Sequence, residues 1–144
     1  MRTIGLLLRN KGGSLWSTAP GATVYDALRV MAEKDVGALL VMEGGKLVGI
    51  ISERDYARKV VLKGRTSRET LVREIMTERP ICIRTDQTIE EAMALMTNKR
   101  IRHLPVLAEG RLAGVISIGD VVKDIISEQE FTIHQLENYI TGHR

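Results

Sequence analysis

The sequence predicts an α/β (α+β) fold made of two β-α-β-β-α repeats packed about a pseudo-twofold axis. Residues Thr23–Asp55 align without a gap to Thr88–Asp120, at an offset of 65 residues, and 12 of the 33 aligned pairs are identical. Both copies show the same succession of short apolar runs and helical spacing. Because one copy has too few strands to bury both faces of its sheet, we expect the copies to pack on each other.

Each copy opens with a short extended stretch, 14–18 or 81–84, followed by a helix. Thr23 and Thr88 each precede an acidic residue three positions later, which fits a capping box. There the hydroxyl accepts from an early backbone N–H, and the carboxylate reaches back to the cap. Behind both caps, apolar residues recur at helical spacing, so the sequence predicts a helix in each copy.

A hairpin follows each of these helices. The pairs Gly44-Gly45 and Glu109-Gly110 are turn signals, and apolar runs of strand length flank them. The predicted strands are 38–42 and 46–51 in the first copy, and 104–107 and 111–116 in the second. A further helix should begin at Ser52 or Ser117.

The remaining segments connect and extend the copies. Residues 64–76 form the connector and should contain a short helix, and the chain beyond Asp124 is helical in pattern. The predicted divisions are residues 1–65 for the first repeat, 66–127 for the second, and 128–144 for a C-terminal helical tail.

Composition excludes several classes of protein. The net charge of +3 in 144 residues is too small for a dedicated nucleic-acid binder. The single Cys82 excludes an internal disulfide framework and fits a reducing compartment. Since no apolar run approaches the roughly 20 residues of a membrane span, we expect a cytoplasmic protein. Enzyme and metal-site motifs are absent, so we expect neither catalysis nor a bound metal.

The motif Gly-x-x-Ser-x-x-Asp ends both copies, as Ser52-Glu-Arg-Asp55 and Ser117-Ile-Gly-Asp120. Each is an acceptable helix cap, worth about 1 kcal/mol and needing no ligand. A helix N-terminus also suits a phosphate, a cap hydroxyl can contact a phosphate oxygen, and the aspartate can accept from a ribose diol. Those contacts describe a nucleotide, and capping does not exclude binding.

The chain resembles the CBS-domain family, and specifically the small stand-alone proteins made of one tandem CBS pair (a Bateman module). The resemblance is carried by residues 48–55, 101–106 and 113–120, and 72–77 is similar to the family's usual start of a second repeat. Related modules in the AMP-activated kinase gamma subunit and in IMP dehydrogenase bind adenine nucleotides. The resemblance therefore implies a regulatory module for AMP, ATP or NAD(H), acting on a protein partner in trans.

The resemblance also implies two nucleotide clefts between the repeats, one at each Ser-x-x-Asp. The aspartates would bind ribose, the serines and basic groups phosphate, and aliphatic strand residues adenine. The first cleft would combine Ser52, Arg54 and Asp55 with Thr77, Ile81, Ile101, Arg102 and His103. The second would combine Ser117, Gly119 and Asp120 with Lys11, Trp16, Val36, Gly37 and Ala38.

The two clefts differ in charge. Arg54, Arg102 and His103 can hold a phosphate in the Asp55 cleft, whereas Lys11 is the one candidate cation in the other. We therefore expect the Asp55 cleft to prefer phosphate-bearing nucleotides.

Two other functions stay open at this point. One is a ligand-free scaffold for oligomerisation or protein contact, and the other is polyanion binding through the basic stretch 54–73. Whatever the function, we expect a twofold homodimer. It should form through apolar residues of the second helices, namely Tyr56, Val60, Val121, Val122 and Ile125. A second apolar stripe in the tail, either packed on its own module or lying across the dimer, consists of Phe131, Leu136, Tyr139 and Ile140.

Overall fold

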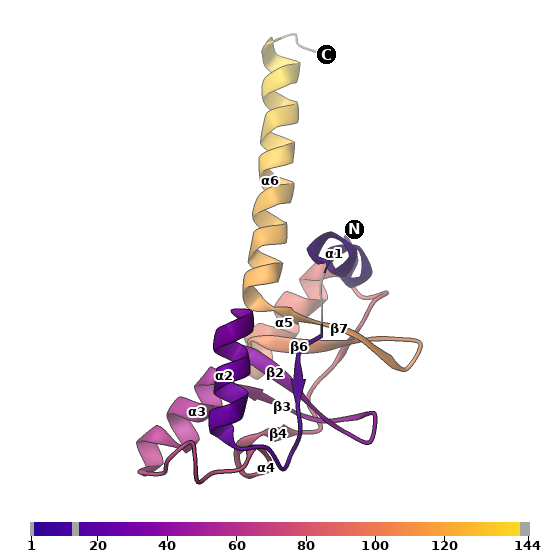
Figure 1. Cartoon of the computed structure of the whole chain (residues 1–144). Helices are drawn as coiled ribbons and strands as arrows, with labels where there is room; N and C mark the ends of the chain where they lie inside the picture. Colours follow the sequence, from indigo (N-terminus) through magenta and orange to yellow (C-terminus); the bar gives the residue numbers. More distant parts are fainter. Residues whose placement is uncertain (1, 13–14, 142–144) are drawn as a thin grey trace. The chain divides into compact units, whose positions relative to one another are not determined.

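Two hairpins, one from each copy of the duplicated segment, form the centres of two compact units. The computed structural model describes residues 2–12 and 15–141 (Figure 1). Residues 15–82 form one unit, called here the repeat 1 unit. Residues 2–12 join residues 83–141 in the other, the repeat 2 unit. Both units combine a sheet with helices, so the predicted mixed α/β class is confirmed.

The repeat 1 unit holds a four-stranded sheet in the order β1-β2-β3-β4. The strand β1 is parallel to β2, and the other neighbours are antiparallel. The elements in chain order are β1 (Ser17–Thr18), α2 (Val24–Lys34), β2 (Ala38–Glu43), β3 (Lys46–Ser52), α3 (Glu53–Lys59), the 3-10 turn η1 (Val61–Lys63), α4 (Val72–Ile75) and β4 (Thr77–Glu78).

The repeat 2 unit holds a three-stranded sheet in the order β5-β6-β7, with the same pairing directions. The strand register of its hairpin shifts between Val106 and Leu107, at the position equivalent to the shift between Val41 and Met42 in the repeat 1 hairpin. The elements are α1 (Ile4–Lys11), β5 (Ile83–Arg84), α5 (Ile89–Lys99), β6 (His103–Ala108), β7 (Arg111–Ser117) and α6 (Ile118–Thr141).

The predicted hairpin turns are confirmed. Gly44 and Gly45 have φ angles of 58° and 78°, and Glu109 and Gly110 have 51° and 78°. Positive φ at both central residues is the conformation of a type I′ turn, whose twist matches the flanking strands. The glycines tolerate that conformation because they lack a Cβ atom.

The caps of α2 and α5 are confirmed only in part. The hydroxyl of Thr23 accepts from Asp26 N–H at 3.1 Å, and that of Thr88 accepts from Glu91 N–H at 3.2 Å. The predicted return contact from the acidic side chain is wrong at both of these described caps. Their backbones instead form β-bridges, Thr23 with Leu71 and Thr88 with Thr3. Those bridges bring in a chain segment that local sequence spacing does not reveal.

The two segments that lead into the repeats exchange places. The helix α1, which precedes the first repeat, packs in the repeat 2 unit, where Ile4 N–H donates to Gln87 O at 2.8 Å and Gly5 N–H to Thr85 O at 2.9 Å. The segment that precedes the second repeat packs in the repeat 1 unit, where Val72 N–H donates to Ala22 O at 2.8 Å. Each lead-in segment thus completes the unit of the other repeat.

The exchange explains one pair of identical glycines in the duplication. A Cβ atom on Gly49 would lie 2.9 Å from the carbonyl oxygen of Thr77 and 2.7 Å from Met76 Sδ. A Cβ atom on Gly114 would lie 2.8 Å from a methyl group of Leu8. A side chain in β3 would therefore meet the backbone of the segment that precedes the second repeat, and one in β7 would meet a side chain of α1.

Each unit has its own apolar core. Val60 and Val121, expected on an exposed dimer face, are fully buried in these cores. That expectation was wrong for both residues, because Val60, at the end of α3, and Val121, in the first turns of α6, pack among the buried apolar residues of their own units. Tyr56 and Ile125 pack against the cores as partly buried residues, and Val122 stays exposed.

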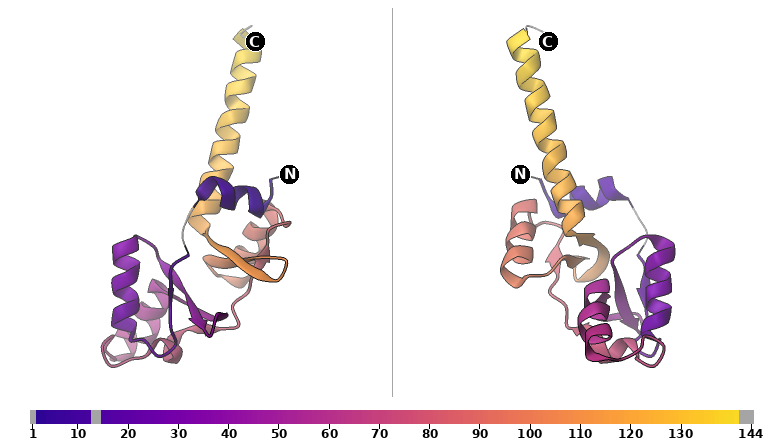
Figure 2. Two further views of the ribbon diagram at one scale, coloured as in Figure 1. Left: turned by 45° about the vertical axis from the view of Figure 1, so that its right-hand side comes forward. Right: turned by 90° about the vertical axis from the view of Figure 1, so that its left-hand side faces the viewer.

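The predicted helical tail, 128–144, is helical over its described part, 128–141, and residues 142–144 lie outside the described residues. This part continues the helix that begins after Ser117, so that α6 runs unbroken for 24 residues. Figure 2 shows α6 extending far past α1, with its last turns beside no other element of the repeat 2 unit. Among the described residues, no helix is both long and apolar enough to cross a membrane.

Candidate functional site

The start of α3 is a complete capping box. Ser52 Oγ accepts from Asp55 N–H at 3.3 Å, and Asp55 Oδ2 accepts from Ser52 N–H at 2.9 Å. The Ser52 hydroxyl itself lies 3.1 Å from the same carboxylate oxygen. The capping role predicted for this motif is confirmed, and it fixes both side chains at the end of β3.

The start of α6 repeats this arrangement. Ser117 Oγ accepts from Asp120 N–H at 3.1 Å, and Asp120 Oδ2 accepts from Ser117 N–H at 2.8 Å. The duplicated motif therefore presents the same pair of groups twice, a hydroxyl and a half-buried carboxylate. Gly119, between them, has no side chain, whereas Arg54 stands at the equivalent position of the other copy.

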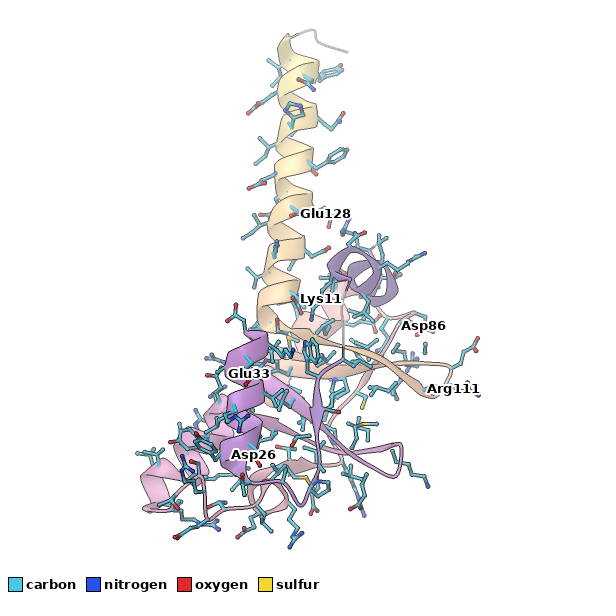
Figure 3. All side chains as sticks on the ribbon, viewed as in Figure 1. Lys11, Asp26, Glu33, Asp86, Arg111 and Glu128 are labelled. Atoms are coloured by element: carbon cyan, nitrogen blue, oxygen red, sulfur yellow. The ribbon has the colours of Figure 1, made fainter. Side chains whose placement is uncertain are left out.

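The cation that neutralises each carboxylate comes from a different place. Lys59, one turn further along α3, lies 3.3 Å from Asp55 Oδ1 and donates to Ile75 O at 2.9 Å. Lys11, at the end of α1, donates to Asp120 Oδ2 at 2.7 Å and to Val115 O at 2.8 Å. Figure 3 labels Lys11, which the sequence placed beside Asp120 only by resemblance.

The charge of Asp120 is favoured by these contacts. Burial by itself would raise the pKa of Asp120, but hydrogen bonds from Lys11 and from Ser117 N–H, with the nearby positive charge of Lys11, outweigh burial and lower it. The carboxylate is thus held ionised and able to accept hydrogen bonds from hydroxyl donors.

A cavity of about 280 Å³ opens beside this carboxylate, between α1 and α6 within the repeat 2 unit. Its lining is rich in charge and includes a bidentate ion pair between Arg2 and Asp124, with Nε 2.9 Å from Oδ2. Its lining residues are Arg2, Leu7, Asn10, Lys11, Asp120, Lys123, Asp124 and Ser127.

Several predicted site residues gather at their own helix starts. Gly37 O accepts from Glu53 N–H at 3.0 Å, and Ala38 pairs with Ser52 across the sheet. In the other unit, Arg102 O accepts from Ile118 N–H at 2.8 Å, and His103 pairs with Ser117. The resemblance assigns these strand beginnings to the cleft of the opposite copy, and that combination stays a prediction.

The other predicted residues are placed as follows. Trp16 lies beneath the ammonium group of Lys34, 4.4 Å from the ring centre, and packs with Val36 against the repeat 1 core. Thr77 is exposed in β4, and Ile81 is 39% exposed. Arg54 lies in α3, and Ile101 packs against the repeat 2 core.

Sequence reasoning missed Lys59. The signal was available, because a lysine four residues after an aspartate on a helix is placed to pair with it. Among the described residues, no group of His, Cys, Asp and Glu side chains could hold a metal ion.

The basic stretch 54–73 is partly occupied within its own unit. Lys59 pairs with Asp55, Arg65 with Glu74, and Arg68 stacks on Tyr25 with 4.0 Å to the ring centre. These contacts reduce the charge available to a polyanion.

Comparison with known proteins identifies the duplicated architecture. The family model described as "CBS domain" matches residues 15–62 and 72–127. The CBS domain-containing protein CBSX3, mitochondrial, of Arabidopsis thaliana is 42% identical over 150 residues, which cover 97% of this chain and 72% of the relative.

Two solved structures are similar along most of the chain. A putative signal-transduction protein with CBS domains from Burkholderia ambifaria is 48% identical with a TM-score of 0.85, covering 88% of this chain and 96% of that one. The structure of CBSX2 in complex with AMP is 28% identical with a TM-score of 0.70, covering 90% and 99%.

Proposed function

Because the chain belongs to the CBS-domain family, we propose that it is a regulatory module that binds an adenine nucleotide, namely AMP, ATP or an NAD(H)-type ligand. One observation carries the proposal: the two Ser-x-x-Asp helix starts hold a hydroxyl and a carboxylate in the same arrangement. The AMP complex of the similar CBSX2 supports the choice of ligand. The proposed sites are those that the resemblance implies, with residues from both repeats.

Each aspartate is proposed to accept hydrogen bonds from the ribose hydroxyls. A carboxylate has about four acceptor positions, so Asp120 can keep its backbone contact to Ser117 while binding a hydroxyl. Lys11 and Lys59, which neutralise the two carboxylates, would then lie beside the bound nucleoside.

The two sites are proposed to differ in their preference for phosphate. Arg54 stands next to Asp55, whereas Gly119 stands next to Asp120. With Arg102 and His103 added, the Asp55 site gathers more positive charge, and it should bind phosphate-bearing nucleotides more tightly.

Thermal unfolding with AMP, ADP, ATP, NAD, NADH and S-adenosylmethionine tests the binding proposal. A ligand at 100 times its Kd adds about 2.7 kcal/mol to the free energy of unfolding. Titration of Asp55→Ala and Asp120→Ala with AMP tests the asymmetry, with the exposed Asp26→Ala as the matched control. No stabilisation by any compound at millimolar concentration contradicts binding, and equal losses in the two variants contradict the asymmetry.

The remaining parts of the proposal concern partners. The module is proposed to be a cytoplasmic homodimer that signals nucleotide occupancy to another protein, without catalysing a reaction itself. Cell fractionation with an antibody to the chain tests the compartment, since the similar CBSX3 is mitochondrial by name.

A ligand-free scaffold is the second candidate, and the long exposed end of α6 favours it. A module that stays unresponsive to every nucleotide but forms a stable oligomer supports the scaffold instead.

A further inference from the structure

We propose that α6 pairs with α6 of a second copy of this chain as a parallel, two-stranded coiled coil. The proposal deepens the homodimer of the proposed function by naming its surface. The observation is a stripe of apolar side chains along the exposed side of α6, distinct from the side that carries the buried Val121. Its members are Val122 at 40% exposed, Ile126 at 48%, Ile133 at 55%, Leu136 at 57% and Ile140 at 81%.

The spacing of the stripe is that of a heptad repeat. With Gln129 included, the stripe advances by alternating steps of four and three residues, which is the seam of a left-handed coiled coil. The a positions are Ile126, Ile133 and Ile140, and the d positions are Val122, Gln129 and Leu136. All three a positions are isoleucine and one d position is leucine, Leu136; β-branched residues at a with leucine at d favour two strands.

The helix itself needs a partner over this stretch. Nearly every residue from 128 to 140 is exposed, and Figure 3 shows the helix beyond Glu128 with side chains projecting on all sides. A helical stretch as short as 128–140 gains little stability in water by itself, because most helical stability in proteins comes from the packing of an apolar face. Pairing of two copies supplies that packing to both at once.

Gln129 selects the parallel direction. In a parallel pair, Gln129 meets Gln129 of the second copy, and the two amides can hydrogen-bond to each other. In an antiparallel pair, a positions face d positions, so when the two stripes overlap along their whole length Gln129 would lie against Ile133 of the other copy with its amide unsatisfied. A buried polar group without a hydrogen bond is costly, and a polar residue in the seam is a known device for fixing register.

The length of the seam sets the strength of the pair. From Val122 to Ile140 it spans 19 residues, roughly 28 Å at 1.5 Å per residue. Fewer than three full heptads give a modest interface, so we expect a dimer that dissociates measurably on dilution.

Disulfide crosslinking of the full chain tests the direction and the surface together. In a Cys82→Ser background, Leu136→Cys places sulfur at a d position, where parallel helices bring the two copies into contact. Gln135→Cys, one residue away and off the seam, is the matched control. Mild oxidation should crosslink most of the Leu136→Cys protein and little of the control. Equal crosslinking of the two variants, or none in Leu136→Cys, overturns the proposal.

Light scattering across a dilution series tests the energetics. Ile133→Glu should raise the dimer dissociation constant at least tenfold, while the off-seam Gln135→Glu should leave it nearly unchanged. A wild-type chain that is monomeric at micromolar concentration, or an Ile133→Glu dimer as tight as wild type, overturns the proposal. Crosslinking that is efficient only between Ile126→Cys and Leu136→Cys chains shows an antiparallel pair and overturns the parallel one.

The outcome is independent of nucleotide binding. If Leu136→Cys crosslinks but no nucleotide stabilises the wild type, the coiled coil stands and the proposed ligand is wrong. If nucleotides stabilise Ile133→Glu as they do the wild type while its dissociation constant is unchanged, the coiled coil alone is wrong.

Discussion

The ammonium group of Lys11 lies 2.7 Å from Asp120 Oδ2 and 2.8 Å from the carbonyl oxygen of Val115. One side chain therefore joins the end of α1 to the start of α6, across 109 positions of sequence. We therefore expect this contact to stabilise the repeat 2 unit and to keep the Asp120 carboxylate ionised.

Replacement of Lys11 should weaken that connection. Lys11→Met keeps much of the aliphatic stem and removes the charge, so we expect a loss of about 1 kcal/mol of unfolding free energy, because the pair is partly exposed. The midpoint of thermal unfolding should fall by roughly 2–4 °C. Lys123→Met, which lines the same cavity, should change it far less. An equal effect of the two substitutions would show that Lys11 stabilises the fold only through its positive charge and not through its contact with Asp120.

Acid should release the same contact. The pKa of Asp120 is lower in the folded chain than in the unfolded chain, since the contacts from Lys11 and Ser117 outweigh burial. A lowered pKa contributes stability above the unfolded value of about 3.9, and that stability is lost as pH falls through the folded pKa. Below about pH 4, the free energy of unfolding of Asp120→Asn should therefore fall less steeply with decreasing pH than that of the wild type.

Urea unfolding at a series of pH values measures this dependence of the unfolding free energy on pH, with Asp26→Asn as the control. Identical pH slopes for wild type and Asp120→Asn would contradict the assignment.

The hydroxyl of Ser52 can be tested for binding separately from capping. Replacing a cap serine by alanine costs typically about 1 kcal/mol, whereas glycine costs only a few tenths. Ser52→Gly should therefore keep most of the stability of the chain but lose the same AMP affinity as Ser52→Ala. The measurement is AMP titration beside urea unfolding. If Ser52→Gly binds AMP like the wild type, the hydroxyl serves the cap and makes no ligand contact.

The paired glycines should respond unequally to alanine. At Gly49 the new methyl group would meet the backbone carbonyl of Thr77, which cannot move without disturbing the β3–β4 pairing. At Gly114 it would meet the far end of the Leu8 side chain, which can rotate. We expect Gly49→Ala to cost about 2–3 kcal/mol and Gly114→Ala about 1 kcal/mol. Urea unfolding measures the loss of unfolding free energy in both variants. A larger loss for Gly114→Ala than for Gly49→Ala would contradict this prediction.

Most of the elements could be predicted from short stretches of sequence. A few neighbouring residues were enough to predict the caps at Thr23 and Thr88, the hairpin turns at Gly44 and Glu109, and the helix starts at Ser52 and Ser117. The physical causes of these features are also local. Nearby side chains accept hydrogen bonds from the free backbone N–H groups at each helix start, and the turns need φ angles that few residues adopt.

Contacts between segments far apart in the sequence could not be predicted from such local patterns. A repeat at a fixed offset suggests that each copy is complete, and nothing in the spacing indicates that Gly5 donates to Thr85 or that Leu71 pairs with Thr23. For the same reason the partner of Lys11 came only from resemblance. Val60 and Val121 were misjudged because a valine in an amphipathic helix gives no sign of which neighbour covers it.

The exchange of lead-in segments also governs the order in which the protein can be completed during synthesis. The repeat 1 unit is one continuous stretch, 15–82, and all of it is synthesised before β5. The helix α1 is made before the repeat 1 unit, yet the strands that cover Ile4 and Leu7 follow about 70 to 110 residues later, a delay of roughly 4 to 20 seconds at typical rates of synthesis. The helix α1 therefore lacks its packing partners while the whole repeat 1 unit is synthesised, a delay that a chain refolding from denaturant does not meet.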